Sequence, residues 1–289
     1  MRIIEPSELI INPDGSIFHL HMKPGQLAEN IILVGDPDRV KMIAEFFDSI
    51  ESQTHNREFV SATGNYGSKR ITVLSTGIGT DNIDIVVNEL DALVNIDLQT
   101  RQVKKEFKSL NIIRIGTSGG LQGDIPVNAF LASRKAIGFD GLLNFYERRD
   151  EVSDLNFESA FKAHVNWNRN LPSPYVVEAD SALFDKIVDE DFTAGVTISA
   201  PGFYGPQGRE LRLRIVDPQI NDKIETFRFE DQRITNYEME CSAIYGLSKL
   251  LGHKALTVCI IIANRISRKA NENYKPVMIQ LVQKVLDRI

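Results

Sequence analysis

The sequence predicts an α/β protein: a single domain over residues 1–289, built as a three-layer sandwich with a central mixed, mostly parallel sheet flanked by helices. Three observations predict this fold. Short apolar strands repeatedly end in turns rich in Gly, Ser, Thr and Arg, as buried parallel strands do. Segments with helical spacing of apolar residues alternate with these strands. No repeat, low-complexity tract or linker divides the 289 residues, a length that suits one large domain.

In the first half of the chain, residues 1–29 read as an irregular N-terminal arm with a short strand at Ser16–His21. The alternation of strands and helices begins at residue 31. We expect strands at 31–34, 71–74 and 111–115, and helices at Asp38–Phe47 and Asn82–Val94. Asp97–Leu110 is polar and rich in Lys and Gln, and we interpret it as an exposed helix or an insertion.

In the second half, strands are expected near 129–136 and 194–200, separated by a polar stretch around 140–172. Ser181–Val188 has helical spacing. Glu238–Leu251 is interpreted as a helix that Asn236 caps and Gly252 ends. The chain closes with a buried strand at Ala255–Ala263 and an amphipathic helix at Val277–Ile289.

The charge and cysteine content narrow the classes of function. A net charge of -6 and a pI near 5.5 argue against a nucleic-acid-binding surface, and arginines clustered inside an acidic protein suggest a small anionic ligand. Cys241 and Cys259 lie in apolar stretches without a CxxC motif, which favours buried free thiols in a reducing compartment. Neither a signal peptide nor a membrane-spanning run is visible, so we expect a cytoplasmic protein that does not bind membranes.

Three Gly-rich turns indicate an anion site. They are Gly35–Arg39, Ser75–Thr80 and Arg114–Gly120, and each follows an apolar strand. Backbone N–H groups and guanidinium groups at the carboxyl ends of such strands suit a phosphate. Gly77 and Gly79 also suggest a dinucleotide site, but the third glycine and the acidic ribose anchor of that fingerprint are missing.

These turns and the segment Asn236–Glu240 (Asn-Tyr-Glu-Met-Glu) stand in the order of the motifs of the nucleoside phosphorylase family, of the purine/uridine phosphorylase type. The chain resembles this family from about Phe18 to its C-terminus. Within the family, Phe203–Arg209 and Asn264-Arg265 are most similar to uridine phosphorylases. The resemblance implies reversible phosphorolysis of uridine, and of 2′-deoxyuridine or thymidine if the pocket admits them, to uracil and ribose 1-phosphate.

For the phosphate, the resemblance implies binding by Gly35, Arg39, Arg114 and Thr117, with Arg57 reaching in from a neighbouring subunit. The physical chemistry agrees, because a dianion needs several guanidinium, N–H and hydroxyl donors to offset its dehydration. The alternative is that Arg39 and Arg57 are ordinary surface ion-pair partners.

For the ribose, the resemblance implies binding by Glu238, Met239 and Glu240, of which we choose Glu240 as the acceptor for the 2′- and 3′-hydroxyls. A carboxylate also favours the cationic sugar of the transition state. His19 corresponds to a histidine that contacts the 5′-hydroxyl from the neighbouring subunit. Alternatively, the two glutamates only complement a helix dipole and the histidine is a surface residue.

For the base, the resemblance implies that Phe203 lines the pocket and that Gln207 and Arg209 bind the uracil. An amide and a guanidinium fit its two carbonyls and N3–H, and they disfavour cytosine. Purine-specific relatives place a catalytic aspartate after the last strand, where this chain has Asn264. Arg265 is therefore a candidate to support the departing base.

The resemblance thus assigns catalysis to Arg114, Gln207, Arg209, Glu240 and Arg265, with phosphate as co-substrate and no organic cofactor. It implies active sites shared between subunits, and a homodimer is favoured over a hexamer. Glu58, Ile71 and Ser75 match positions that hold a monovalent cation, potassium, between subunits in some relatives. Ile266–Tyr274 follows the site directly and could close over it as a lid.

Two alternatives remain open at this point. The chain could be a purine nucleoside phosphorylase, or a nucleosidase that uses water in place of phosphate. It could also be a catalytically inactive protein that binds nucleosides.

Overall fold

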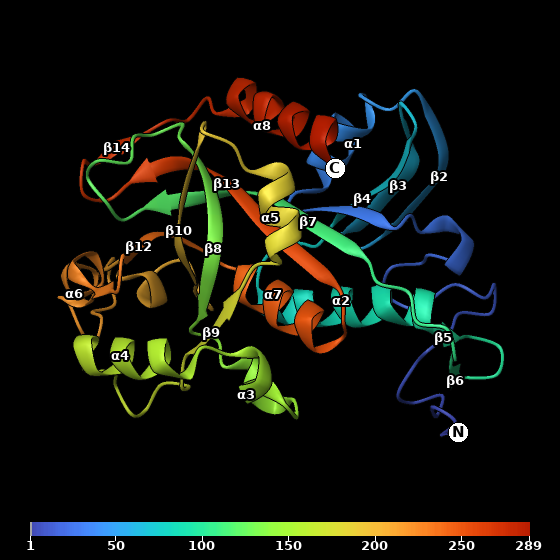
Figure 1. The fold of residues 1–289 in the computed structure, drawn as a ribbon, viewed down its shortest axis with the longest axis horizontal. Helices are drawn as coiled ribbons and strands as arrows, with labels where there is room; N and C mark the ends of the chain where they lie inside the picture. Colours follow the sequence, from blue (N-terminus) through green and yellow to red (C-terminus); the bar gives the residue numbers. More distant parts are fainter. Residues whose placement is uncertain (1) are drawn as a thin grey trace.

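One mixed sheet organises the chain in the computed structural model, which describes residues 2–289 (Figure 1). It has twelve strands, and its main path runs β11-β12-β10-β8-β13-β7-β1-β4-β3-β2. The central pairs β4/β1, β1/β7, β7/β13, β8/β10 and β10/β12 are parallel, and antiparallel pairs extend the sheet on both sides. The fold class predicted from the sequence is confirmed.

The strands take these bounds: β1 Asn30–Val34, β2 Ser49–Asn56, β3 Phe59–Tyr66, β4 Lys69–Ser75, β5 Ile96–Asp97, β6 Gln102–Val103, β7 Asn111–Gly120, β8 Phe130–Gly138, β9 Tyr175–Glu178, β10 Phe192–Ser199, β11 Arg228–Phe229, β12 Gln232–Glu238, β13 Lys254–Asn264 and β14 Lys269–Ala270. The helices are α1 Pro37–Ala44, α2 Thr80–Asn95, α3 Arg149–Val152, α4 Leu155–Val165, α5 Ser181–Ile187, α6 Ile220–Thr226, α7 Cys241–Leu250 and α8 Lys275–Arg288. Three short 3-10 turns lie at Pro24–Gln26, Leu142–Phe145 and Gly205–Gln207.

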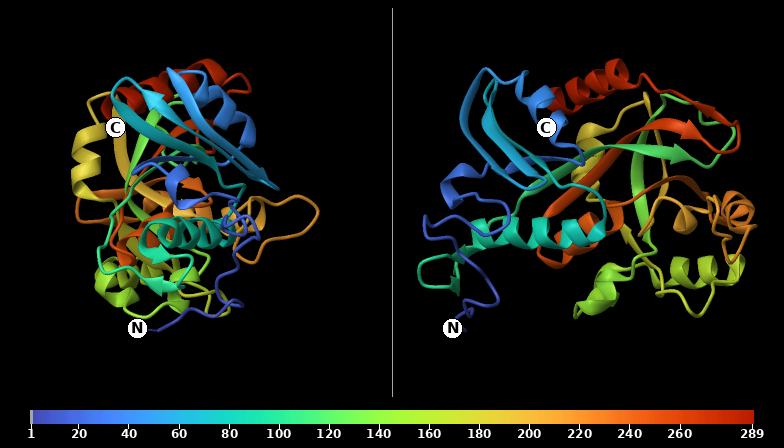
Figure 2. Two further views of the ribbon diagram at one scale, coloured as in Figure 1. Left: turned by 90° about the vertical axis from the view of Figure 1, so that its right-hand side faces the viewer. Right: turned by 180° about the vertical axis from the view of Figure 1, so that it is seen from behind.

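The helices cover both faces of the sheet, as the sandwich prediction requires. The apolar side chains of α2 and α7 pack against one face of β1 and β7, around Leu33 and Ile112. Those of α1, α5 and α8 pack against the other face, around Ile32 and Ile113. Figures 1 and 2 show the two groups of helices on opposite sides of these strands. Because alternate residues of a strand point to opposite faces, strands buried on both sides read as continuous apolar runs.

Strand β12 closes part of the sheet on itself. It pairs in parallel with β10 and also in antiparallel with the end of β7, where Tyr237 lies opposite Gly119. β7, β13, β8, β10 and β12 therefore form a closed ring of strands, and the ends of β7, β12 and β13 meet. This closure brings segments near residues 120, 237 and 264 to one place.

Several predictions about individual elements were wrong. Ser16–His21 is not a strand: Ile17 forms an isolated bridge with Ile11 and the chain then turns at residues 18–20, where backbone N–H groups bond to a side chain instead of a strand. For Asp97–Leu110 the helix alternative is wrong, and the insertion alternative stays a prediction; the segment completes the β5–β6 hairpin that begins at Ile96. Its turn is set by the Asp97 carboxylate, which accepts from the N–H of Gln99 and Thr100.

The helix expected at Glu238–Leu251 begins only at Cys241. Asn236 is not its cap, since it lies within β12, and Glu238 is the last residue of that strand. The hairpin β2–β3 was not predicted at all, because β2 is a polar edge strand without an apolar pattern.

No helix within residues 2–289 is long and apolar enough to cross a lipid bilayer.

Candidate active site

The carboxyl ends of β1 and β4 lie beside the middle of β7, which brings two of the predicted phosphate turns next to Arg114. In the pairing register, Leu33 lies opposite Arg114 and Val34 lies opposite Ser75. Gly35 and Gly77 meet so closely that a Cβ on Gly35 would lie 3.3 Å from the Gly77 carbonyl oxygen. The turns Gly35–Arg39 and Ser75–Thr80 leave the ends of β1 and β4 as predicted. Arg114–Gly120 is not a turn, because it pairs with β13 as far as Gly120 and so continues β7.

Arg114 is the buried cation of this region. It is only 5% exposed, and its Nη2 donates to Glu240 Oε2 while Nη1 lies 3.5 Å from Glu238 Oε2. Burial opposes the charge of the guanidinium, but the Coulomb attraction of Glu240 and Glu238 outweighs it and raises the Arg114 pKa. Arg114 is thus paired with both glutamates of the Glu-Met-Glu motif.

The Arg114 side chain occupies space that is free only because residue 116 is a glycine. A Cβ on Gly116 would overlap the Arg114 guanidinium and lie 3.1 Å from Cys259 Sγ. The guanidinium therefore folds back along β7 over a residue that has no side chain. Thr117 follows, half-buried, on the same strand.

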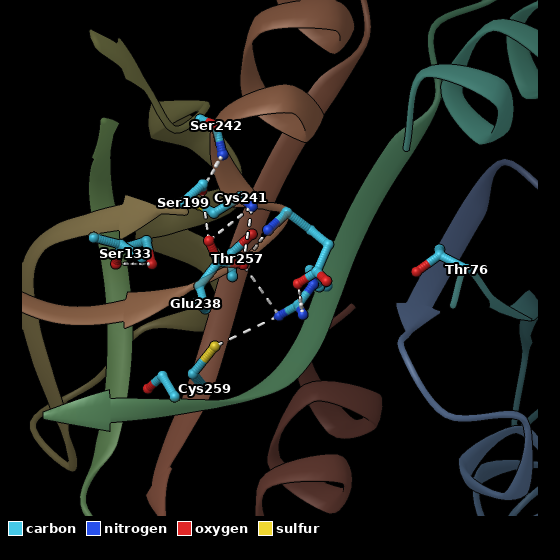
Figure 3. A network of polar contacts seen from close by, with 12 residues as sticks. Thr76, Ser133, Ser199, Glu238, Cys241, Ser242, Thr257 and Cys259 are labelled. Carbon is cyan, nitrogen blue, oxygen red and sulfur yellow. Dashed lines mark hydrogen bonds and ion pairs between the residues drawn. The ribbon is translucent and has the colours of Figure 1, made fainter. Parts of the chain in front are cut away.

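The two glutamates have different surroundings. Glu238 accepts from the Ser199 hydroxyl and from the N–H groups of Glu240 and Cys241, so it fixes the start of α7 (Figure 3). Burial, opposed by Arg114 and reinforced by the charge of Glu240, raises the Glu238 pKa to about 7. Glu240 instead holds Arg114 through one oxygen and the Gly79 N–H, at 2.8 Å, through the other. Met239, between them, is half-buried.

Both cysteines lie beside this cluster and are buried free thiols, as predicted. Cys259 Sγ accepts from Arg114 Nη1 at 3.7 Å, and Cys241 is the first residue of α7 (Figure 3). Burial raises the pKa of the Cys259 thiol to about 12, so it remains protonated at neutral pH.

Arg39 and Arg57 lie at the same edge and form no ion pair with any residue of the described chain, 2–289. Arg39 is in the first turn of α1, where the helix dipole adds to its charge, and its Nη2 donates to the Tyr274 hydroxyl at 3.3 Å. Arg57 is exposed at the tip of the β2–β3 hairpin, in a left-handed conformation with φ 55°. The alternative of surface ion pairs thus finds no support in either residue.

A second cluster gathers the residues predicted to bind the base. Gln207 is buried, and its Oε1 accepts from Arg209 Nη1 at 2.6 Å and from Arg265 Nη2 at 3.2 Å. Arg209 also stacks on the Phe203 ring, 3.7 Å from the ring centroid. Burial and then the charge of Arg265 lower the Arg209 pKa to about 10, and neither arginine has an acidic partner within residues 2–289.

The sequence analysis missed Tyr237 in this cluster. Arg265 lies over its ring at 5.1 Å, and its buried hydroxyl has no hydrogen-bond partner within residues 2–289. Burial raises the Tyr237 pKa above its ordinary value and keeps the phenol neutral. Its position in the Asn-Tyr-Glu-Met-Glu segment, next to Glu238 on the same strand, is the signal that could have revealed it.

His19 lies apart from both clusters in this subunit. It contacts Glu89 on α2, with Nδ1 2.6 Å from Glu89 Oε1. The predicted role of His19 and of the arm (1–29) at a subunit interface stays a prediction.

The cation candidates do not gather around one point within the subunit. The Ser75 hydroxyl donates to the Glu58 carbonyl at 2.5 Å, whereas Ile71 lies four residues earlier on β4, about 13 Å away at the rise of a strand. Within residues 2–289, no group of three or more His, Cys, Asp or Glu side chains could hold a metal. A potassium ion between subunits stays a prediction.

Comparisons with known proteins agree with this geometry. Residues 29–288 match the sequence profile of the Phosphorylase superfamily. Among characterised relatives, the uridine phosphorylase of Thermococcus kodakarensis is 28% identical over 264 residues, which cover 89% of this chain and 80% of the relative. A DeoD-type purine nucleoside phosphorylase of Listeria monocytogenes is 27% identical over 244 residues, which cover 84% of this chain and 85% of the relative.

Two solved structures share the fold. A Trypanosoma brucei nucleoside phosphorylase, reported to show uridine phosphorylase activity, superimposes with a TM-score of 0.87 and 29% identity over 97% of this chain and 98% of its own. A uridine phosphorylase of Phytophthora capsici, at 19% identity and a TM-score of 0.75, covers 99% of this chain and 98% of its own and supports the fold alone. With a family match over nearly its whole length, the chain belongs to the phosphorylase superfamily and is a pentosyltransferase of that superfamily.

Proposed function

We propose that this nucleoside phosphorylase acts on uridine and converts it reversibly, with phosphate, to uracil and ribose 1-phosphate. The observation that carries the proposal is the cluster of Gln207, Arg209 and Arg265. It concentrates two guanidinium groups and an amide, without a carboxylate, in one half-buried place. Uracil offers two carbonyl oxygens to such donors and leaves as an anion, which the same guanidinium groups stabilise.

Asn264 weakens the case for a purine substrate. It is 2% exposed, and its Nδ2 donates to the carbonyls of Gln122 and Ile125. Its Oδ1 accepts from the N–H groups of Ile266 and Ser267. The side chain thus holds two loops together and has no free group to protonate a purine ring. A purine nucleoside phosphorylase is kept as the second candidate, because relatives of that kind match the chain.

In the proposed reaction, phosphate is held by Gly35, Arg39, Arg114 and Thr117, with Arg57 supplied by a second subunit. The bond between C1′ and N1 breaks and its electron pair leaves with the uracil, while a phosphate oxygen forms the new bond to C1′. Arg114 Nε is buried without a partner within residues 2–289, so the guanidinium has a donor to spare beyond its glutamate contacts.

Glu240 supplies the negative charge next to the sugar. It accepts from the 2′- and 3′-hydroxyls and stabilises the positive charge that develops at C1′. Its present partners, the Arg114 guanidinium and the Gly79 N–H, place the carboxylate between the phosphate turns and the strand end at Glu238. Met239 packs on the sugar, and Phe203 covers the base.

The proposal includes a homodimer with shared active sites, in the cytoplasm and in pyrimidine salvage. Arg57 supports the shared site: it is an exposed cation at a hairpin tip, adjacent to the phosphate turns, without an acidic partner in the described part of its own subunit. The segment 266–274 folds back through β14 onto β13, and we retain it as a lid.

A substrate panel tests the proposed base specificity. Uridine, 2′-deoxyuridine, thymidine, cytidine and inosine are each incubated with phosphate, and the free base is measured. We expect uracil release from uridine to exceed base release from inosine and cytidine by at least 10-fold. Preferential release of hypoxanthine from inosine would support the purine alternative, and binding of uridine without turnover would support an inactive binding protein.

A further inference from the structure

Glu89 is a buried acid that the proposed mechanism does not use. It lies on α2, is 8% exposed, and has no Lys or Arg partner within residues 2–289. Its carboxylate instead faces the turn of the N-terminal arm. Oε2 accepts from the N–H groups of His19 and Leu20 at 3.1 and 2.9 Å, and Oε1 lies 2.6 Å from His19 Nδ1.

These contacts fix the tautomer and the direction of the His19 ring. The Glu89 carboxylate oxygens act as acceptors here, for two backbone N–H groups and for the His19 ring, so Nδ1 carries the hydrogen of that contact. The ring is also packed edge-on against Phe18 at 4.8 Å and Phe59 at 6.4 Å between ring centroids. Nε2 is left without a partner within residues 2–289, on a side chain that is 29% exposed.

We propose that Glu89 is a positioning residue, which aims Nε2 of His19 at the 5′-hydroxyl of the nucleoside bound by the neighbouring subunit. This inference rests on the proposed function in one respect, namely that His19 reaches the sugar across a dimer. The arrangement serves either protonation state. A neutral ring accepts from the 5′-hydroxyl through Nε2, and a charged ring donates to it, because a hydroxyl can do both.

A purely structural role would look different. If Glu89 only held the arm in place, its backbone contacts to His19 and Leu20 would suffice. The loss of Glu89 would then lower kcat/KM for all substrates alike. A positioning role is instead confined to substrates that carry the 5′-hydroxyl. The pair of substrates uridine and 5′-deoxyuridine separates the two roles.

The experiment measures kcat/KM for both substrates in the wild type, in the single variants E89A, E89Q and H19A, and in the double variant that combines E89A with H19A. We expect the wild type to prefer uridine by about 10-fold, the size of one hydrogen bond with a preorganised partner. In E89A this preference falls to about 2-fold or less, with 5′-deoxyuridine turnover unchanged. In E89Q the preference for uridine is intermediate, because the amide oxygen can still accept from Nδ1–H of His19 but the amide NH2 group faces a backbone N–H. The double variant is no worse than H19A.

Asp91→Asn is the matched control. Asp91 lies on the same helix and pairs with another histidine, as Oδ1 is 3.2 Å from His253 Nε2. We expect this variant to keep the preference for uridine.

An unchanged preference in E89A, or equal losses on both substrates, would overturn the inference. Because the 5′-hydroxyl belongs to the sugar, the test does not depend on the base. If the wild type cleaves inosine and not uridine, the proposed substrate is wrong, and inosine with 5′-deoxyinosine tests Glu89 in the same way.

Discussion

The substitution Glu240→Gln distinguishes the catalytic contribution of Glu240 from that of Glu238, the other glutamate of the Glu-Met-Glu motif. The substitution keeps the size of the side chain and one acceptor oxygen, but it removes the negative charge beside the developing cation at C1′. Losing one such preorganised electrostatic contact costs about 100-fold in kcat, or roughly 2.7 kcal/mol. We therefore expect Glu240→Gln to lower kcat/KM for uridine phosphorolysis by about two orders of magnitude.

The variant should still fold, because Glu238 remains 3.5 Å from Arg114 Nη1 and gives the buried guanidinium a counter-charge. Glu238→Gln is the matched comparison: it removes a carboxylate that faces Ser199 and the start of α7, and we expect less than a 10-fold loss. Initial rates of uracil release, with a thermal unfolding curve for each variant, make the measurement. If Glu240→Gln retained more than a fifth of wild-type kcat/KM, the carboxylate would not be the group that stabilises the sugar.

Three further predictions follow from contacts in the same region. Gly116→Ala forces the Arg114 guanidinium away and should raise the KM for phosphate by about 10-fold or more. Gly119→Ala is the control and should change this KM little, because its Cβ would meet nothing closer than a carbonyl oxygen at 3.9 Å. Phosphate saturation curves of the two variants make the comparison. Tyr274→Leu removes the hydroxyl that accepts from Arg39, and it should raise the KM for phosphate about 3-fold without changing the KM for uridine. The control is Tyr66→Phe, which removes a 2.6 Å hydrogen bond to Asp287 at the far end of α8. The pKa of Glu238 in the folded protein, about 7, lies above the ordinary glutamate value of 4.5, so the contribution of Glu238 to stability is present below pH 4.5 and is lost as pH rises through 7. Urea unfolding should show the free energy of unfolding falling over that window in the wild type and a flatter profile in Glu238→Gln.

The strands that carry the phosphate turns could be predicted because their signals are local. An apolar run such as 31–34 followed by Gly35 specifies a buried parallel strand and its turn without reference to the rest of the chain. The edge hairpin β2–β3 lacks such a signal, since β2 is polar and its pairing is determined by β3 and β4.

The helix predicted at Glu238 shows the limit of periodicity. Apolar residues continue at helical spacing from Tyr237 through Cys241 to Ile244, but the pairing of β12 with both β10 and β7 makes the first part a strand. The candidate site residues were predicted through their motifs. Their partners were not, because Glu89, Tyr237 and Tyr274 enter through contacts between segments far apart in the sequence.

The most direct test of the central claim is the dependence of uridine cleavage on phosphate. Purified protein is incubated with uridine over a series of phosphate concentrations, and uracil and ribose 1-phosphate are both quantified. We predict saturable dependence on phosphate, with the two products formed in equal amounts and no uracil in its absence. Uracil release at the same rate without phosphate, with free ribose as the second product, would show a hydrolase. That result would contradict the assignment of Arg114 to the binding of a reacting phosphate.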